Sequence, residues 1–319
     1  MSTQHPIVAI TGSPGSGRST ISNAFREIFL RENINAEYVK GDAFRRFNQD
    51  DMHMAVIEAD RQNRCISHFG PDANEFAALE LLFHHYGESA TGRTRTYVNK
   101  FNAEELVQEP GSFTPWRDVK EDTDLLFYEG LHGGVMAQSW TRRSMSPSHN
   151  PRVVKERRQP SRNAGVDVAQ YVDLLIGVVP VVNLEWIQKI HRDYDVKGRE
   201  ASDATTNILR RMRDYIHFMV PQFSLTDINF QRVPLVDTSN PFVAMDVPNP
   251  EESMLVIRFR DPQRHDFPML LERFDNSFMS RPNTMVIPGG KLRHSLEVIC
   301  QPMIHGMLEA SRASDSTSA

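Results

Sequence analysis

The chain has 319 residues, of which 24% are charged and 39% are hydrophobic, and its formal net charge is −5 at pH 7. This length can bury a full core, whereas the acidic balance argues against general nucleic-acid binding, which needs a basic face. The two cysteines, Cys65 and Cys300, exclude a disulfide framework and favour a reducing, cytoplasmic location. Neither a membrane-spanning run of about 18 apolar residues nor a signal-peptide pattern is found.

Short apolar segments alternate with helix-like ones, a pattern typical of a mostly parallel α/β sheet covered on both faces. Strands are predicted at residues 7–11, 36–40, 125–129, 174–179 and 232–236, with two edge strands of alternating polarity at 254–260 and 284–287. Helices are predicted at residues 20–30, 75–86, 184–192, 204–218 and 292–308. We interpret residues 1–310 as one domain and the small, polar residues 311–319 as a disordered tail.

A glycine-rich turn lies between the first predicted strand and the first predicted helix. This order of strand, turn and helix is typical of a phosphate-binding loop, because glycines let successive amides face one anion at a helix N-terminus. The spacing matches the fingerprint G-x-x-x-x-G-K-[ST]. The predicted nucleotide-binding residues are Gly12, Ser13, Gly15, Ser16, Gly17, Arg18, Ser19 and Thr20, and Ser19 can also reach a magnesium ion.

Arginine at position 18 replaces the lysine of that fingerprint, so another residue is a candidate for its role. Lys189, on the predicted helix 184–192, is our first candidate and Arg18 is the rival. Arginine is bulkier and forked, so it does not simply replace lysine in a tight turn.

Further polar residues follow the ends of the predicted strands, where ligands bind in such sheets. Asp42, after the second strand, is placed to accept a proton from an attacking hydroxyl, with a turn-forming role as the alternative. Glu129 ends an apolar strand, where an acid usually holds magnesium. Asp193 lies four residues after Lys189, so a salt bridge within the helix is its alternative role. Arg192 adds positive charge for the transition state.

Residues 139–162 are unlike their surroundings, with seven arginines and lysines, three prolines and a single acid. Such a segment cannot bury enough apolar surface to order itself. We interpret it as a solvated surface insertion, with a docking arm for an acidic partner as the alternative.

Several longer runs resemble the phosphoribulokinases of bacteria, and the likeness covers nearly the whole chain except the basic insertion. The runs are GDAF at 41–44, GRTRTY at 92–97, LFYEGLHG at 126–133, VPVVNLEWIQKIHRD at 179–193, DINFQRVP at 227–234 and VDTSNPF at 236–242. The resemblance implies a P-loop fold like that of nucleoside monophosphate kinases. It also implies MgATP as donor, ribulose 5-phosphate as acceptor and ribulose 1,5-bisphosphate as product.

The resemblance also implies the roles of individual residues. Asp42 would be the general base, Glu129 and Asp193 would serve the metal, and Lys189 and Arg192 would bind phosphate. Bacterial relatives form homo-oligomers, typically octamers, that NADH activates and AMP inhibits. Four arginines match positions linked to that regulation: Arg31, Arg211, Arg258 and Arg281.

The chain departs from the family mainly where the family grips the sugar phosphate. Arg45 replaces a usual histidine, Gln49 an arginine, Asn99 a histidine and Lys197 an arginine. Arg46 and Tyr97 complete the predicted acceptor-binding set. The sequence therefore leaves three hypotheses open: a ribulose 5-phosphate kinase, a related kinase for another sugar phosphate, polyol or nucleoside, and a nucleotide-sensing protein without turnover.

Overall fold

The structure is a computed structural model that describes residues 4–136, 165–179, 181, 184–187, 190, 201–240 and 247–318. Within these residues one sheet has eight strands in the order β2-β5-β1-β6-β7-β8-β10-β9. The strands are β1 (Ile7–Gly12), β2 (Ala36–Lys40), β5 (Leu125–Gly130), β6 (Leu174–Val179), β7 (Ile228–Pro234), β8 (Ser253–Phe259), β9 (Phe278–Arg281) and β10 (Thr284–Pro288). The five from β2 to β7 pair in parallel and the last three antiparallel, which confirms the predicted mixed α/β sheet.

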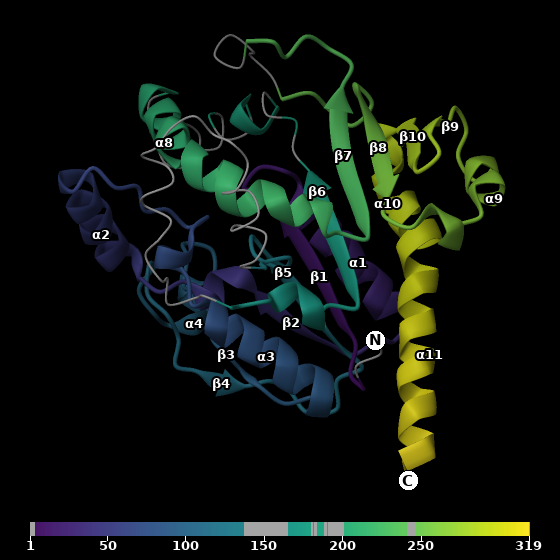
Figure 1. Cartoon of the computed structure of the whole chain (residues 1–319), viewed down its shortest axis with the longest axis horizontal. Coiled ribbons are helices and arrows are strands. Elements are labelled where there is room, and N and C mark those ends of the chain that lie inside the picture. The colour runs from purple at the N-terminus through teal and green to yellow at the C-terminus, as the bar shows by residue number, and fades with distance from the viewer. Residues whose placement is uncertain are drawn as a thin grey trace.

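Helices cover both faces of the sheet (Figure 1). One face packs against α1 and the C-terminal helices, where Phe25, Ile257 and Ile304 belong to a single buried cluster. The other face packs against α3, through Phe83 and Tyr128 among others. The helices are α1 (Arg18–Arg31), α2 (Gln49–Arg61), α3 (Phe76–Ser89), α4 (Ala103–Leu106), α8 (Ala201–Asp214), α9 (Phe267–Glu272), α10 (Leu292–Ser295) and α11 (Gln301–Ser318); a small ribbon pairs β3 (Arg93–Thr94) with β4 (Arg117–Asp118).

Strand β5 lies between β1 and β2, so the first two strands of the chain are not neighbours in the sheet. The physical reason is burial. Phe127 packs in one apolar cluster and Leu126 in the other, so β5 needs cover on both faces, whereas β2 ends in the exposed Lys40 and lies at the edge. The carboxyl ends of β1, β2 and β5 still meet at one side of the sheet.

The antiparallel end of the sheet differs most from the prediction. β8 and β10 are interior strands, and the edge is β9, which the sequence did not predict. Polar and apolar residues alternate along β8 because its two faces are covered unequally. Ile257 is buried under the C-terminal helices, whereas Arg258 is exposed. The strand predicted at 232–236 begins earlier, at Ile228, and ends at Pro234.

Helix boundaries also differ from the prediction. The helices α2, α4 and α9 were missed, and the helix predicted at 204–218 is α8 followed by a π-helical turn, Tyr215–Met219. The helix predicted at 184–192 is described only at 184–187 and 190, and the basic segment 139–162 lies outside the described residues.

The C-terminal tail is a further correction. Helix α11 continues to Ser318, so the predicted disordered tail is helical over 311–318. Ser311 is only 8% exposed, and its hydroxyl donates a hydrogen bond to the Gln4 carbonyl. The buried stripe of Ile304 and Leu308 thus extends into the tail and holds the helix against the sheet. Among the described residues, no helix combines the length and apolarity needed to cross a membrane.

Candidate active site

The glycine-rich loop has the backbone that a phosphate cradle needs. Gly15 and Gly17 have φ angles of 89° and 94°, a left-handed region that favours glycine, and α1 begins directly after Gly17. A Cβ atom on Gly12 would lie 2.8 Å from the Val178 carbonyl oxygen and 2.8 Å from the Ser16 hydroxyl. The loop therefore packs too closely on β6 to carry a side chain at position 12.

We expect Gly12→Ala to weaken ATP binding by about tenfold to a hundredfold, because the added methyl forces the loop away from β6 at a cost of about 1–3 kcal/mol. Titration with a non-hydrolysable ATP analogue measures the effect. Gly306→Ala on α11 is the matched control, since its Cβ meets no atom within 4 Å. That control variant should keep the wild-type affinity for the ATP analogue, and alanine should stabilise helix α11 relative to glycine. Equal affinities for the two variants would contradict the close packing of the loop.

Two of the predicted metal residues meet at the carboxyl ends of neighbouring strands. The Ser19 hydroxyl, in the first turn of α1, donates a hydrogen bond of 3.2 Å to Oε1 of Glu129. Glu129 pairs in register with Ile10 of β1, so β5 delivers its carboxylate beside the loop. Hydroxyl and carboxylate oxygens are ligands that Mg²⁺ prefers. The third predicted metal residue, Asp193, lies outside the described residues, as do Lys189, Arg192 and Lys197.

The loop separates two cavities. The first, which we call the apolar cavity, has a volume of about 270 Å³ and is lined by loop residues together with Leu184, Phe230 and Leu255. The second, which we call the arginine cavity, has a volume of about 420 Å³. Its lining residues include Arg18, Asp42, Arg45, His68, Glu185 and Arg211. Glu185 lines both cavities, so they adjoin at this residue.

Asp42 lies in the arginine cavity, on the turn Gly41–Phe44 that follows β2. Its Oδ1 accepts a hydrogen bond of 2.6 Å from Nη2 of Arg45. The Arg45 guanidinium also stacks over the Tyr97 ring, 4.7 Å from its centre. Arg45 therefore orients the Asp42 carboxylate, and stacking on Tyr97 holds the Arg45 guanidinium in place.

Arg18 and Arg45 share a second property. The Nε atom of each is buried, and within the described part of the chain neither Nε has a hydrogen-bond partner. Burying an unpaired donor is costly. Both guanidiniums therefore have unused donor capacity beside the cavity that they line.

Three other residues predicted to bind the acceptor do not line the arginine cavity. Arg46 donates to Glu75 at 2.8 Å and to the Asn74 carbonyl. The backbone N–H of Gln49, at the start of α2, donates a hydrogen bond to the Gly111 carbonyl. Asn99 accepts a hydrogen bond from the Phe101 amide and so stabilises a local turn. Among the described members of that set, Arg45 is thus the one that lines the cavity and contacts Asp42, and Tyr97 contacts Arg45 without lining the cavity.

Sequence reasoning missed two histidines near the arginine cavity. His68 lines the cavity, and its backbone carbonyl contacts Nε2 of the buried His132 at 2.8 Å. Burial, reinforced by Arg45 and Arg211, lowers the pKa of His68 to about 2. Burial, together with Arg18 and Arg45, lowers the pKa of His132 to about 4. Both imidazoles are therefore neutral at pH 7 and leave the positive charge of the cavity to its arginines.

Asp214 anchors α8 beside this cavity and was also missed, because nothing near it in sequence marks it. Its Oδ2 accepts a hydrogen bond of 2.7 Å from Ser67. Cys65 donates to the Arg210 carbonyl at 3.0 Å, so two bonds tie α8 to the segment that carries His68. Burial raises the pKa of Asp214 to about 6.

We expect Asp214→Asn to remove part of the pH dependence of stability. The raised pKa means that the folded state binds more protons than the unfolded state between about pH 4 and 6, so the free energy of unfolding falls as pH rises through this window. The charged form costs about 3 kcal/mol at pH 7. Denaturant unfolding from pH 4 to 7 should show a shallower decline for the variant than for the wild type and for the exposed control Asp275→Asn. Parallel curves would contradict the raised pKa.

Two of the predicted regulatory arginines line a third cavity. Arg258 and Arg281 contribute to a space of about 500 Å³ with Asn229, Gln231 and Thr284. Arg211 is not part of it, because it lines the arginine cavity. The antiparallel strands β8 and β9 thus place two of the four arginines together.

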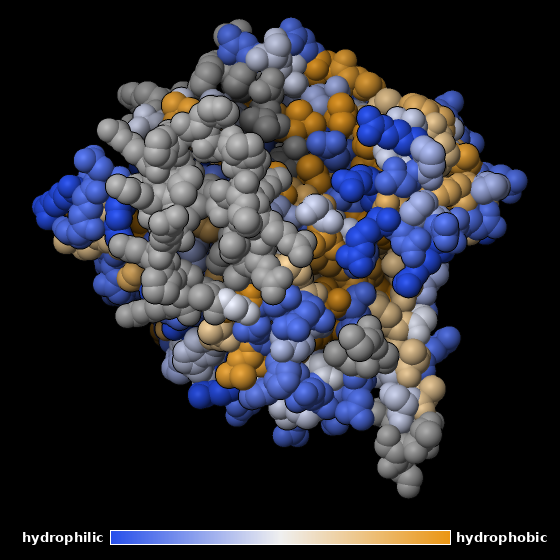
Figure 2. Space-filling view, viewed as in Figure 1, coloured by the Kyte–Doolittle hydropathy of each residue, from blue (hydrophilic) through white to orange (hydrophobic). Residues whose placement is uncertain are grey.

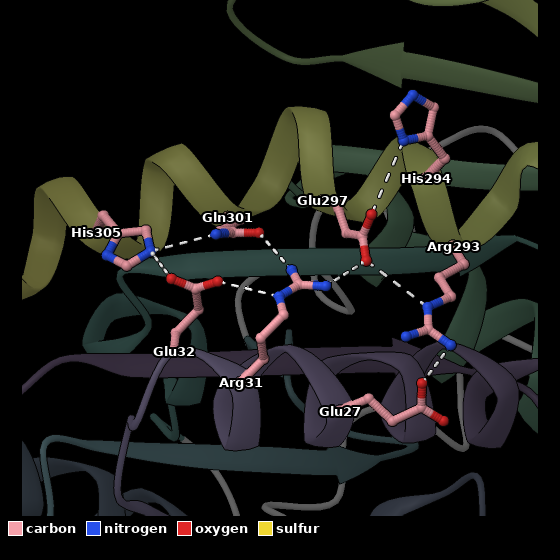
Figure 3. A network of polar contacts seen from close by, with 8 residues as sticks. All are labelled: Glu27, Arg31, Glu32, Arg293, His294, Glu297, Gln301 and His305. Atoms are coloured by element: carbon pink, nitrogen blue, oxygen red, sulfur yellow. Dashed lines mark hydrogen bonds and ion pairs between the residues drawn. The ribbon is translucent and has the colours of Figure 1, made fainter.

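Arg31 lies elsewhere, in a polar network between α1 and the C-terminal helices (Figure 3). It contacts Glu32 at 3.1 Å, Glu297 at 2.9 Å and Gln301 at 3.1 Å. The hydrogen bond from Arg31 lowers the pKa of Glu297. Arg258 is on the face of β8 opposite Ile257, and Arg31 is not among the described residues that line the cavity of Arg258 and Arg281.

Comparison with known proteins gives the family. The model of the Phosphoribulokinase / Uridine kinase family matches residues 7–146 and 153–239. A phosphoribulokinase from Sinorhizobium medicae is 47% identical over 310 residues, which cover 97% of this chain and 98% of that protein. A probable phosphoribulokinase from Escherichia coli is 45% identical over 313 residues, covering 98% and 99%.

The structural comparison agrees. The solved phosphoribulokinase from Rhodobacter spheroides is 45% identical, covers 98% of this chain and 100% of its own, and gives a TM-score of 0.82. The predicted P-loop kinase fold and the resemblance drawn from the sequence are thereby confirmed. The chain belongs to the phosphoribulokinase / uridine kinase family.

Proposed function

We propose that this protein transfers the γ-phosphoryl group of ATP to ribulose 5-phosphate and so makes ribulose 1,5-bisphosphate, a reaction of the Calvin cycle. The observation that carries the proposal is the arginine cavity, in which Asp42 lies beside the phosphate loop and among guanidiniums. Relatives that match nearly the whole length and are named phosphoribulokinase support it. The adjoining apolar cavity, next to the loop, suits the uncharged base of the nucleotide.

The proposed reaction needs one proton acceptor. The acceptor hydroxyl forms a bond to the γ-phosphorus, the bond from that phosphorus to ADP breaks, and Asp42 takes the hydroxyl proton. Arg45 holds the Asp42 carboxylate at 2.6 Å and fixes its direction. Arg18, at the end of the loop, lines the same cavity as Asp42, where negative charge would build up during transfer.

The residues present fit a magnesium ion, which would neutralise phosphate charge during transfer. Ser19 and Glu129 supply a hydroxyl and a carboxylate side by side next to the loop, and Asp193 is proposed as a further ligand. Lys189 and Arg192 are proposed to bind the phosphates from the helix that follows β6. ATP and Mg²⁺ are thus the proposed donor and metal.

A coupled ADP-release assay over a panel of sugar phosphates tests the proposal. Turnover with ribulose 5-phosphate well above that with the other acceptors is the expected result. Turnover restricted to another sugar phosphate, polyol or nucleoside would replace the acceptor but keep the kinase. Tight ATP binding without turnover on any acceptor would instead favour a nucleotide-sensing protein.

Regulation and assembly follow from the family likeness. We propose NADH as activator and AMP as inhibitor, acting at a site that includes Arg258 and Arg281. We also propose a homo-oligomer, an octamer by resemblance. Hydrophobic residues gather over the upper end of β7 in Figure 2, and the exposed Leu235 and Val236 follow that strand, as expected of a contact surface. Free thiols at Cys65 and Cys300 fit the proposed cytoplasmic location.

A further inference from the structure

Arg95, in the run GRTRTY at 92–97, holds the turn that carries Asp42. It directly follows strand β3, and its guanidinium bridges two carbonyls of the turn region. Nε donates a hydrogen bond to the Ala43 carbonyl at 2.8 Å, and Nη2 donates one to the Arg45 carbonyl at 2.7 Å. A planar guanidinium suits two acceptors at once, whereas the ammonium group of a lysine is a point charge on a flexible stem.

Aromatic rings fix the Arg95 guanidinium in turn. Its central carbon lies 3.7 Å from the centre of the Phe113 ring and 4.7 Å from that of the Trp116 ring. Trp116 also packs against Phe44 of the turn, with 5.8 Å between the ring centres. A guanidinium over an aromatic face is a favourable contact. The same rings therefore hold both the donor group of Arg95 and the turn that it contacts.

The ribbon of β3 and β4 is anchored to β2, the strand that leads into the turn. Nη2 of Arg117, on β4, contacts Oε1 of Glu37 at 2.7 Å, and the Lys120 backbone N–H donates to Oε2 at 3.2 Å. The Glu37 side chain is fully buried, so the loss of either partner would leave a buried charge poorly compensated. Arg95 thus reaches the turn from a ribbon that is itself held against β2.

The turn is held at successive carbonyls. The Asp42 carbonyl accepts a hydrogen bond of 3.3 Å from the Arg45 backbone N–H, and the Phe44 carbonyl accepts one of 2.8 Å from the Glu75 backbone N–H. Arg95 supplies the bonds to the carbonyls at 43 and 45. Because the Arg45 side chain contacts Oδ1 of Asp42, the direction of this carboxylate depends on a backbone that Arg95 fixes. Arg95 is not among the described residues that line the arginine cavity, so it acts on the turn and not on a ligand there.

We propose that Arg95 is a positioning residue for Asp42, because its two hydrogen bonds from the β3–β4 ribbon set the direction in which the Asp42 carboxylate faces the arginine cavity. This inference rests on the proposed function for the role of Asp42 as base. The carboxylate must lie within hydrogen-bond reach of the hydroxyl proton that it takes. A displacement of about 1 Å by a change outside the reacting groups can cost about a hundredfold in rate.

Arg95→Met tests this role, because it removes both donors and keeps an unbranched side chain beside Phe113 and Trp116. The kcat with ribulose 5-phosphate should fall by about tenfold to a hundredfold. The affinity for an ATP analogue should stay within about twofold, since neither Arg95 nor Asp42 lines the apolar cavity within the described residues. Arg95→Lys, which keeps the charge but loses the fork, should have a kcat between those of Arg95→Met and the wild type.

Arg93→Met is the matched control, two residues earlier on the same ribbon. The exposed Arg93 side chain contacts Asp118 at 3.7 Å and the Trp116 carbonyl at 3.5 Å, both on the ribbon side of the turn. This control loses the same charge without losing a bond to the turn. It should therefore keep the wild-type kcat.

A double-mutant cycle distinguishes positioning from general damage. In Asp42→Asn the base is already lost, so the addition of Arg95→Met should lower kcat by less than about threefold more. If the two effects multiply, or if Asp42→Asn alone is harmless, Arg95 does not act through Asp42 and the inference is overturned.

Hydrogen exchange gives a measurement that does not depend on turnover. In Arg95→Met the backbone amides of residues 41–46 should exchange faster than in the wild type, while those of residues 12–20 keep the wild-type rate. Unchanged exchange at 41–46 would overturn the inference. Faster exchange there, in a protein that phosphorylates no acceptor, would refute the proposed function and leave standing that Arg95 fixes the turn. If Arg95→Met does not fold, Arg95→Lys decides the question by the same measurements.

Discussion

Asp42→Asn is expected to lower kcat by about 10²–10⁴, the range for loss of a general base, with little change in the affinity for ATP. The amide cannot accept the proton of the attacking hydroxyl, yet it occupies the same volume on the turn Gly41–Phe44. Because Asp42 lines the arginine cavity and not the apolar cavity, nucleotide binding should be spared. Steady-state kinetics and titration with an ATP analogue separate the two effects.

The control is Asp275→Asn, an exposed carboxylate in the turn before β9. It carries the same chemical change far from the cavity and should keep the wild-type kcat. The amide at position 42 also weakens the contact with Arg45, so a rise in the acceptor KM is compatible with the proposal. Near-normal kcat in Asp42→Asn would remove this residue from the role of base.

Lys189→Met is expected to lower kcat by about 10²–10³, which is more than Arg18→Thr. The substitution removes a positive charge that would stabilise the negative charge developing on the transferred group. Arg18 occupies the lysine position of the loop but lines the cavity that holds Asp42 and Arg45. Its loss should therefore raise the acceptor KM at least as much as it lowers kcat. Kinetics with both substrates varied give the comparison.

Lys120→Met, an exposed lysine beside β4, controls for the loss of one positive charge. This variant should leave kcat and the acceptor KM unchanged. If Arg18→Thr proves the more damaging of the first two variants, the role of the missing loop lysine passes to Arg18. A similar, small effect of all three substitutions would mean that neither residue supplies that charge.

The loop and the metal pair show what could be predicted without a structure. The glycines of the loop, the strand before it and the helix after it are contiguous, so local sequence was sufficient to define them. Glu129 could be predicted because parallel strands bring their carboxyl ends to one edge. The structure accordingly places its carboxylate 3.2 Å from Ser19, although 110 positions separate the two residues.

The rest of the site could not be predicted, for a reason that His68 and Asp214 make plain. Neither belongs to a recognisable local pattern, and each owes its environment to burial by distant segments. The same holds for Arg211, whose helix position indicates nothing about which cavity it reaches. Gln49 and Asn99 show the opposite case. They occupy positions that the family uses to bind the acceptor, yet they do not line the cavity.

By itself the sequence determined the alternation of strands and helices, the phosphate loop, the candidate base Asp42 and the family, because each depends on neighbouring residues or on matching runs. Only the tertiary structure decided that β5 separates β1 from β2, that β9 is the edge, and that Arg18, Arg45 and Arg211 share one cavity. Strand order and cavity lining depend on how apolar faces are buried across the whole chain. That balance is a sum over contacts between residues far apart in sequence, so no single segment encodes it.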